Sequence, residues 1–177
     1  MRRSSFTLPQ RFLHWLMAIC IVTMLFVGVG MVSTVSPLHL TLLSVHKPLG
    51  IAILALAVVR VIVRLTSGSP PLPADLPWVM KLGAHLSHLA LYGLMLAMPL
   101  LGWGMESAGS YPVVLAPGIE LPPIVAPSPQ LYTLLHTAHV DLAYVLFLVV
   151  LAHLAAALFH GLVRRDGVFS AMVRPGE

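Results

Sequence analysis

The sequence predicts an all-α integral membrane protein, a four-helix bundle with both termini on the cytoplasmic side. Three observations lead to this fold class. Hydrophobic residues make up 58% of the 177 residues and charged residues only 9%, whereas a soluble domain carries about 25% charged residues. Four apolar runs approach the length of about 20 residues that crosses a bilayer core as a helix. Lysine and arginine are also distributed unequally between the segments that join these runs.

The four spans are predicted at about 12–32, 45–65, 85–105 and 137–163, within a single domain over residues 1–177. The first run is too long for the apolar part of a signal peptide, and no small-residue cleavage site follows it. We therefore interpret it as a retained span. The segment 106–130 is too rich in proline to continue a helix, so we expect it to fold over one membrane face.

The basic residues predict the orientation of these spans, because lysine and arginine accumulate on the cytoplasmic side of a membrane. Only Lys47 falls on the side of the 106–130 loop. The other nine fall on the side of both termini and the 66–81 linker: Arg2, Arg3, Arg11, Arg60, Arg64, Lys81, Arg164, Arg165 and Arg174. The predicted topology is therefore N-in/C-in, with the 106–130 loop outside.

Histidine is the unusual component of this apolar chain, which contains nine histidines and one cysteine. Cys20 has no partner for an internal disulfide. The chain also lacks a C-x-x-C-H sequence for covalent haem attachment and paired cysteines for zinc or an iron–sulfur cluster. Ionisable residues within membrane spans are expensive to bury and mark functional sites. The histidines are therefore the first candidates for a site.

The histidines of the fourth span define two depths in the bundle. His139 and His153 are 14 residues apart, which is about 21 Å along a helix and about 40° around it, so they share one face. At the outer depth His46 is available opposite His139, and at the inner depth His14 is available. Two facing imidazoles across a helical bundle suit six-coordinate haem iron. Geometry alone leaves both His153 and His160 open as the inner partner, because His160 shares the face of His153.

Three basic residues near these depths are candidate cofactor-binding residues. Arg60 and Arg64 would pair with the propionates of an inner haem, since a guanidinium holds a carboxylate through two hydrogen bonds. The alternative is that they extend to the inner lipid headgroups. Lys47, beside His46, would serve an outer haem in the same way or attract an anion.

Three further histidines are candidates for a quinone or proton site near the inner depth. His85 and His88 enter the third span from the inner side, and His160 lies at the inner end of the fourth. Imidazole titrates near physiological pH and can supply or accept quinone protons. The alternative for His85 and His88 is simple anchoring at the interface.

Four segments together resemble the bacterial cytochrome b561 family: "RFLHW", "HKPLGIAILALAVVRVIVRL", "AHLSHLALYGLMLAMPLLGW" and "HLAAALFH" followed by "RRDG". The resemblance covers nearly the whole chain in order, and it implies a single dihaem transmembrane cytochrome b domain of the bacterial inner membrane, multi-pass with both termini cytoplasmic. The family's ligand histidines fall on His14, His46, His139 and His153. The implied cofactors are two haem b groups, held by His46/His139 outside and His14/His153 inside. The choice of His153 over His160 thus rests on the resemblance.

The resemblance also implies an oxidoreductase that moves electrons between a periplasmic-side donor and the quinone pool. One family activity is the oxidation of superoxide at the outer face with reduction of ubiquinone. Here the outer side carries one basic residue, Lys47, and three acidic residues, Glu106, Glu120 and Asp141. Their net charge of about −2 weakens the case for an anionic donor. The expected partners are membrane lipid, quinone and a periplasmic electron donor, and no nucleic acid.

Two alternative functions remain open at this point. The chain would also fit a cytochrome b subunit of a larger dehydrogenase or hydrogenase, although the compact outer loop offers little docking surface. A histidine-lined metal transporter is the third candidate. That function would require carboxylates near the membrane midplane and ligands at one depth, whereas the histidines here form two layers.

Overall fold

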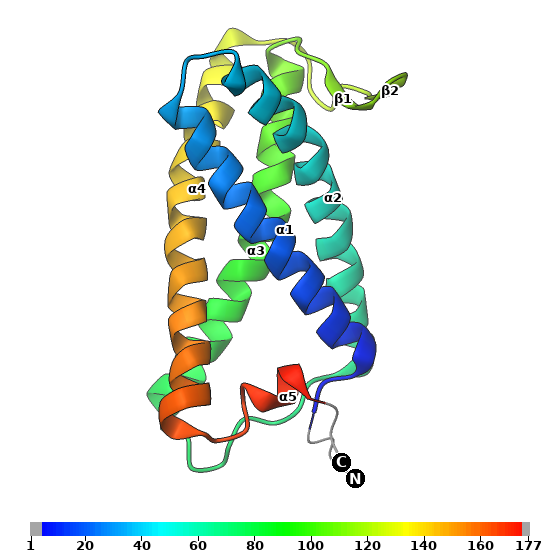
Figure 1. Ribbon diagram of the computed structural model, residues 1–177. Helices are drawn as coiled ribbons and strands as arrows, with labels where there is room; N and C mark the ends of the chain where they lie inside the picture. Colours follow the sequence, from blue (N-terminus) through cyan, green and yellow to red (C-terminus); the bar gives the residue numbers. More distant parts are fainter. Residues whose placement is uncertain (1–4, 175–177) are drawn as a thin grey trace.

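A computed structural model describes residues 5–174 and contains four long helices that form a bundle (Figure 1). All four are long and apolar enough to cross a membrane. The first three predicted spans each lie within one helix. The fourth extends past the end of α4 and is completed by a π-helical turn, η1, that continues this helix. Their bounds are α1 Leu8–Ser33, α2 Leu38–Ser67, α3 Trp78–Ala108, α4 Pro129–Leu158 and η1 Phe159–Arg164.

Local signals in the sequence set the ends of these helices. Thr7 and Gln10 form a capping box at the start of α1, in which each side chain bonds the backbone N–H of the other. The Gln10 side-chain amide also donates to the Gly68 carbonyl at 2.7 Å and so connects the start of α1 to the end of α2. Gly68 ends α2 with φ +70°, a conformation that glycine adopts without strain. At the start of α4, the Ser128 hydroxyl accepts the Leu131 N–H.

The bundle packs in chain order, with α1 on α2, α2 on α3 and α3 on α4. Its core is narrow, and its main cluster of buried side chains is Met17, Ile21, Ile53, Ala57 and Met95. Large apolar side chains cover much of the outside, and Leu146 is the one buried residue of α4. A helix that is apolar on every side requires a hydrocarbon environment around it. The exposed apolar surface therefore agrees with the four membrane-spanning helices.

A short β-hairpin lies between α3 and α4 and was not predicted from the sequence. Strands β1 (Val113–Ala116) and β2 (Ile119–Leu121) pair antiparallel, and Gly118 in the turn has φ +77°. The hairpin lies at the end of the bundle opposite the start of α1 (Figure 1). We call this the hairpin end. The opposite end is the terminal end, where the last short helix α5 (Ser170–Val173) accepts a hydrogen bond from the Phe6 N–H through the Ala171 carbonyl.

Candidate metal-binding histidine pairs

Two histidine rings meet in the half of the bundle near the hairpin end. His46 of α2 and His139 of α4 have ring centroids 6.1 Å apart, with ring planes at 65°. The Nδ1 atoms of both rings are buried and have no hydrogen-bond partner among the described residues. Gly102 of α3 lies against His139, since a Cβ atom at Gly102 would be 3.3 Å from His139 Cε1. The glycine therefore allows the His139 ring its close approach to α3.

A second group of histidine rings meets near the terminal end. His14 of α1 and His153 of α4 have centroids 6.2 Å apart, with planes at 64°. His88 of α3 lies on the same His153 ring, at a centroid distance of 5.8 Å. The structure thus brings a third predicted site histidine to this pair. The His153 ring therefore has an imidazole neighbour on α1 and another on α3.

The ring separations of both pairs would suit two histidine ligands of one iron. A metal–imidazole nitrogen bond is about 2 Å long, and the ring centroid lies about 1 Å behind the bonding nitrogen, so two opposed imidazoles on one ion have centroids about 6 Å apart. A buried imidazole nitrogen without a hydrogen bond is costly, and coordination offsets this cost. No three histidine, cysteine or acidic side chains within residues 5–174 form a group suited to a metal ion. Haem iron needs only two protein ligands, because the porphyrin supplies the other four.

Two arginines of α2 lie near the terminal-end pair. Arg60 donates through NH2 to His14 Nδ1 at 2.9 Å and through Nε to the Tyr92 hydroxyl at 3.2 Å. Arg60 NH1 is buried without a partner among the described residues. The guanidinium carbons of Arg60 and Arg64 both lie 5.9 Å from the centre of the Tyr92 ring. An unpaired guanidinium donor beside a histidine pair suits a haem propionate, so the residues here fit the group.

The contact between Arg60 and His14 also fixes the proton on the His14 ring. A guanidinium only donates, so His14 Nδ1 must accept. In the neutral ring the proton then lies on Nε2, whereas a neutral imidazole binds iron through its unprotonated nitrogen. Ligation by His14 through Nε2 therefore requires Arg60 to release Nδ1.

Lys47 lies beside His46 but is occupied by other contacts. Its ammonium group forms an ion pair with the buried Glu106 carboxylate of α3 and donates to the Pro112 carbonyl at 3.2 Å. The lysine therefore connects α2 and α3 to the segment before the hairpin. Its charge is balanced locally, and the two other acidic residues near this end, Glu120 and Asp141, are both exposed.

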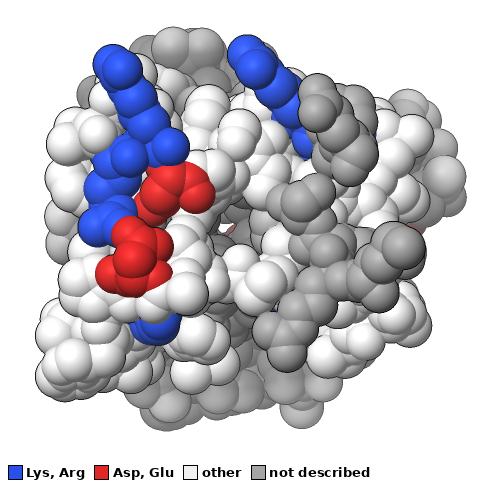
Figure 2. All heavy atoms as spheres, turned by 90° about the horizontal axis from the view of Figure 1, so that it is seen from below, with Lys and Arg blue, Asp and Glu red and all other residues white. Residues whose placement is uncertain are grey.

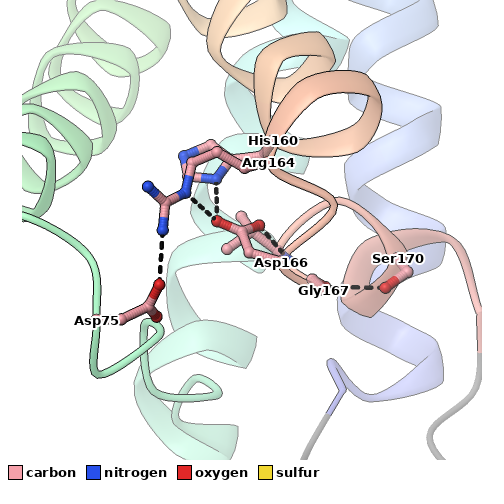
Figure 3. Close-up of polar contacts among 7 residues, drawn as sticks. Asp75, His160, Arg164, Asp166, Gly167 and Ser170 are labelled. Carbon is pink, nitrogen blue, oxygen red and sulfur yellow. Dashed lines mark hydrogen bonds and ion pairs between the residues drawn. The ribbon is translucent and has the colours of Figure 1, made fainter.

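The remaining predicted histidines have different environments. His85 is exposed, and its Nδ1 lies 2.6 Å from the Lys81 carbonyl of its own helix, so it does not join the pair at His153. His160 belongs to a partly buried polar network at the terminal end (Figure 3). Its Nδ1 lies 2.7 Å from Asp166 Oδ2, which also accepts from Arg164 Nε at 2.9 Å.

Sequence reasoning missed Tyr92, Glu106 as a partner of Lys47, and Asp166. Burial would raise the pKa of Asp166, but its hydrogen bonds with His160 and Arg164 outweigh this effect and lower the pKa below its usual value. The carboxylate is therefore ionised near neutral pH. No helical spacing could have indicated Asp166, because it lies beyond the end of the helix, six residues after His160.

Comparison with known proteins shows the family to which this chain belongs. The family model described as "Prokaryotic cytochrome b561" matches residues 5–175. The chain is 29% identical to "Cytochrome b561 homolog 1" of Escherichia coli K12 (96% of this chain, 97% of the relative) and 29% identical to "Cytochrome b561 homolog 2" (96% and 95%). It is 30% identical to "Probable superoxide oxidase CybB" of Yersinia pestis, over 73% of each chain. The family match implies haem b and a multi-pass membrane protein: the chain belongs to the prokaryotic cytochrome b561 family.

Proposed function

We propose that this protein is a dihaem cytochrome b that moves electrons across the bacterial inner membrane, from a donor at the hairpin end to quinone at the terminal end. One observation carries the proposal: two histidine pairs at two depths, each with ring centroids about 6 Å apart. His46 and His139 would hold one haem b, and His14 and His153 the other. Each haem, when bound, supplies reversible one-electron transfer at its iron.

The distribution of charge supports an orientation with the terminal end in the cytoplasm. Among the described residues near this end, seven are basic and two, Asp75 and Asp166, are acidic. Figure 2, a view of this end, shows basic side chains on two parts of the face, one of them beside acidic side chains. The basic residues are Arg11, Arg60, Arg64, Lys81, Arg164, Arg165 and Arg174. This excess follows the positive-inside rule.

The residues of the terminal end have distinct roles in this proposal. Arg60 and Arg64 would bind haem propionates and keep positive charge beside the His14–His153 pair. Quinone reduction takes up two electrons and two protons for each quinone. His85, His88 and His160 are the candidates for supplying those protons, and His160 has a carboxylate partner that the other two lack among the described residues.

Superoxide is the first donor to test, because one relative is named a probable superoxide oxidase. Two superoxide anions would give two electrons and leave as two molecules of oxygen. The hairpin end does not favour an anion electrostatically, since Glu106 balances Lys47, and Glu120 and Asp141 add negative charge. Because the charge of the hairpin end does not attract an anion, a protein electron donor is the second candidate.

The first experiment is a dithionite-reduced minus oxidised spectrum of the purified protein, with a pyridine haemochrome assay for haem content. We expect two haem b per chain with a low-spin α band. Alanine at His46 or His139 should remove the haem of the hairpin end, and alanine at His14 or His153 the other. A folded chain without haem would refute the proposal. Loss of the terminal-end haem in His88→Ala, with its retention in His14→Ala, would reassign that ligand.

A further inference from the structure

The last turn of α4 has an unusual winding that brings two polar residues together. Residues Phe159–Arg164 form a π-helical turn, which is rare and frequent at functional sites. The turn closes with the Arg165 N–H donating to the His160 carbonyl at 2.8 Å, and Arg165 adopts the left-handed region with φ 52°. The chain then reverses, and the Asp166 carboxylate reaches His160 Nδ1 at 2.7 Å. Wider winding thus creates a contact that a regular α-helix would not make.

Asp166 is held in place from several sides (Figure 3). Its Oδ2 accepts from Arg164 Nε at 2.9 Å, and its Oδ1 accepts from the Val168 N–H at 3.3 Å. Arg164 in turn donates from NH2 to Asp75 of the α2–α3 linker at 2.8 Å. The side chains of His160 and Asp166 are 12% and 9% exposed, whereas that of Asp75 is 74% exposed. The charged groups that contact His160 or its partners are therefore Asp166, Arg164 and, at the solvent side, Asp75.

These contacts determine which nitrogen of His160 exchanges protons. An ionised carboxylate only accepts hydrogen bonds, so the Nδ1 atom of His160 must donate to Asp166. The second nitrogen, Nε2, has no hydrogen-bond partner among the described residues. In the neutral ring Nε2 is the accepting atom, and in the imidazolium it carries the proton that can be given away. The His160 ring is therefore held through Nδ1 and can transfer protons through Nε2.

His160 also lies close to the terminal-end histidine pair along α4. It follows His153 by seven residues, about 10 Å along the helix, and lies in the π-helical turn after α4. His160 is therefore the nearer of the two to the terminal surface. His85 and His88 lack this arrangement: Nδ1 of His85 lies on the carbonyl of its own helix, and the His88 ring lies on His153.

We propose that Asp166 is a positioning residue, which fixes the ring and the tautomer of His160 so that Nε2 delivers protons to quinone. This inference rests on the proposed function. As quinone accepts two electrons from the cytochrome, the His160 imidazolium gives a proton from Nε2 to a quinone oxygen, and an O–H bond forms as the N–H bond breaks. His160 then takes up a solvated proton from the aqueous phase at the terminal side and repeats the transfer, which supplies the two protons of the quinol.

The test compares Asp166→Asn, Asp166→Glu and Asp75→Asn in the haem-loaded protein in lipid nanodiscs. The reduced haems are mixed with a short-chain ubiquinone, and their reoxidation is followed by stopped flow. We expect Asp166→Asn to slow reoxidation about tenfold or more at saturating quinone, with little change in the half-saturating quinone concentration. Asp166→Glu should recover part of the rate. Asp75→Asn, which removes only the exposed contact of Arg164, should react like the unmodified protein.

A second measurement reports on positioning without turnover. In the reduced protein labelled with 15N-histidine, and with His160→Gln to assign the signal, His160 should carry its proton on Nδ1. Asp166→Asn should shift this signal toward a mixture of tautomers, while haem content and midpoint potentials stay unchanged. An Asp166→Asn protein that reoxidises at the normal rate would overturn the inference. If the unmodified protein itself is not reoxidised by quinone, the proposed function fails instead.

Discussion

Gly102 provides a sharp test of the hairpin-end haem site, because its missing side chain leaves room for His139. In Gly102→Ala the new Cβ would lie 3.3 Å from His139 Cε1 and 3.6 Å from His139 Nδ1. The ring must then move by a few tenths of an ångström. Overpacking of this kind costs about 1–3 kcal/mol, and a displacement this small belongs at the lower end of the range. About 1 kcal/mol corresponds to about a fivefold loss of haem affinity at this site.

Gly93→Ala is the matched control, since it lies on the same helix and its Cβ would meet nothing within 4 Å. Both variants gain the helix propensity of alanine, about 1 kcal/mol, in the apo and holo forms alike. That gain therefore cancels in the haem affinity. Transfer of haem to excess apomyoglobin measures the loss: one of the two haems should leave about fivefold faster in Gly102→Ala and at the normal rate in Gly93→Ala. Equal rates in both variants would refute the role of Gly102.

Three further outcomes follow from the charges at the two ends. Lys47→Gln should lower the free energy of unfolding by about 3 kcal/mol, because it leaves the buried Glu106 carboxylate without its cation. Adding Glu106→Gln should restore much of this stability, and a thermal melt in which Lys47→Gln unfolds like the unmodified protein would contradict the prediction. The rate of superoxide capture should not fall as ionic strength rises from about 10 to about 200 mM, since the hairpin end is not positive; a severalfold fall would show a positive entrance. Finally, the lowered pKa of Asp166 stabilises the folded state above its usual pKa of 3.8 and stops doing so as the pH falls through the folded-state pKa. The unmodified protein should therefore melt at a higher temperature than Asp166→Asn at neutral pH, and this difference should disappear as the pH falls below 3.8. A difference that persists at low pH would contradict an ionised Asp166.

The sequence alone determined the four membrane helices and the two depths of the histidines. Both follow from short-range regularities, because hydropathy identifies a span and a fixed rise of about 1.5 Å per residue places His139 and His153. The same regularity put His46 and His14 at matching depths, and the structure brings these rings within about 6 Å of their partners. Ligation of iron by these four histidines stays a prediction.

Only the tertiary structure decided which charges lie beside the histidines. Glu106 reaches Lys47 from 59 residues away, and Arg60 reaches His14 from 46 residues away, so no local pattern could reveal either contact. The third histidine at His153 likewise depends on how α3 packs against α4. The contact between His160 and Asp166 requires a π-helical turn, which breaks the periodicity on which sequence reasoning depends. Depth in the membrane is thus encoded locally, whereas partners are set by the packing of one helix against another.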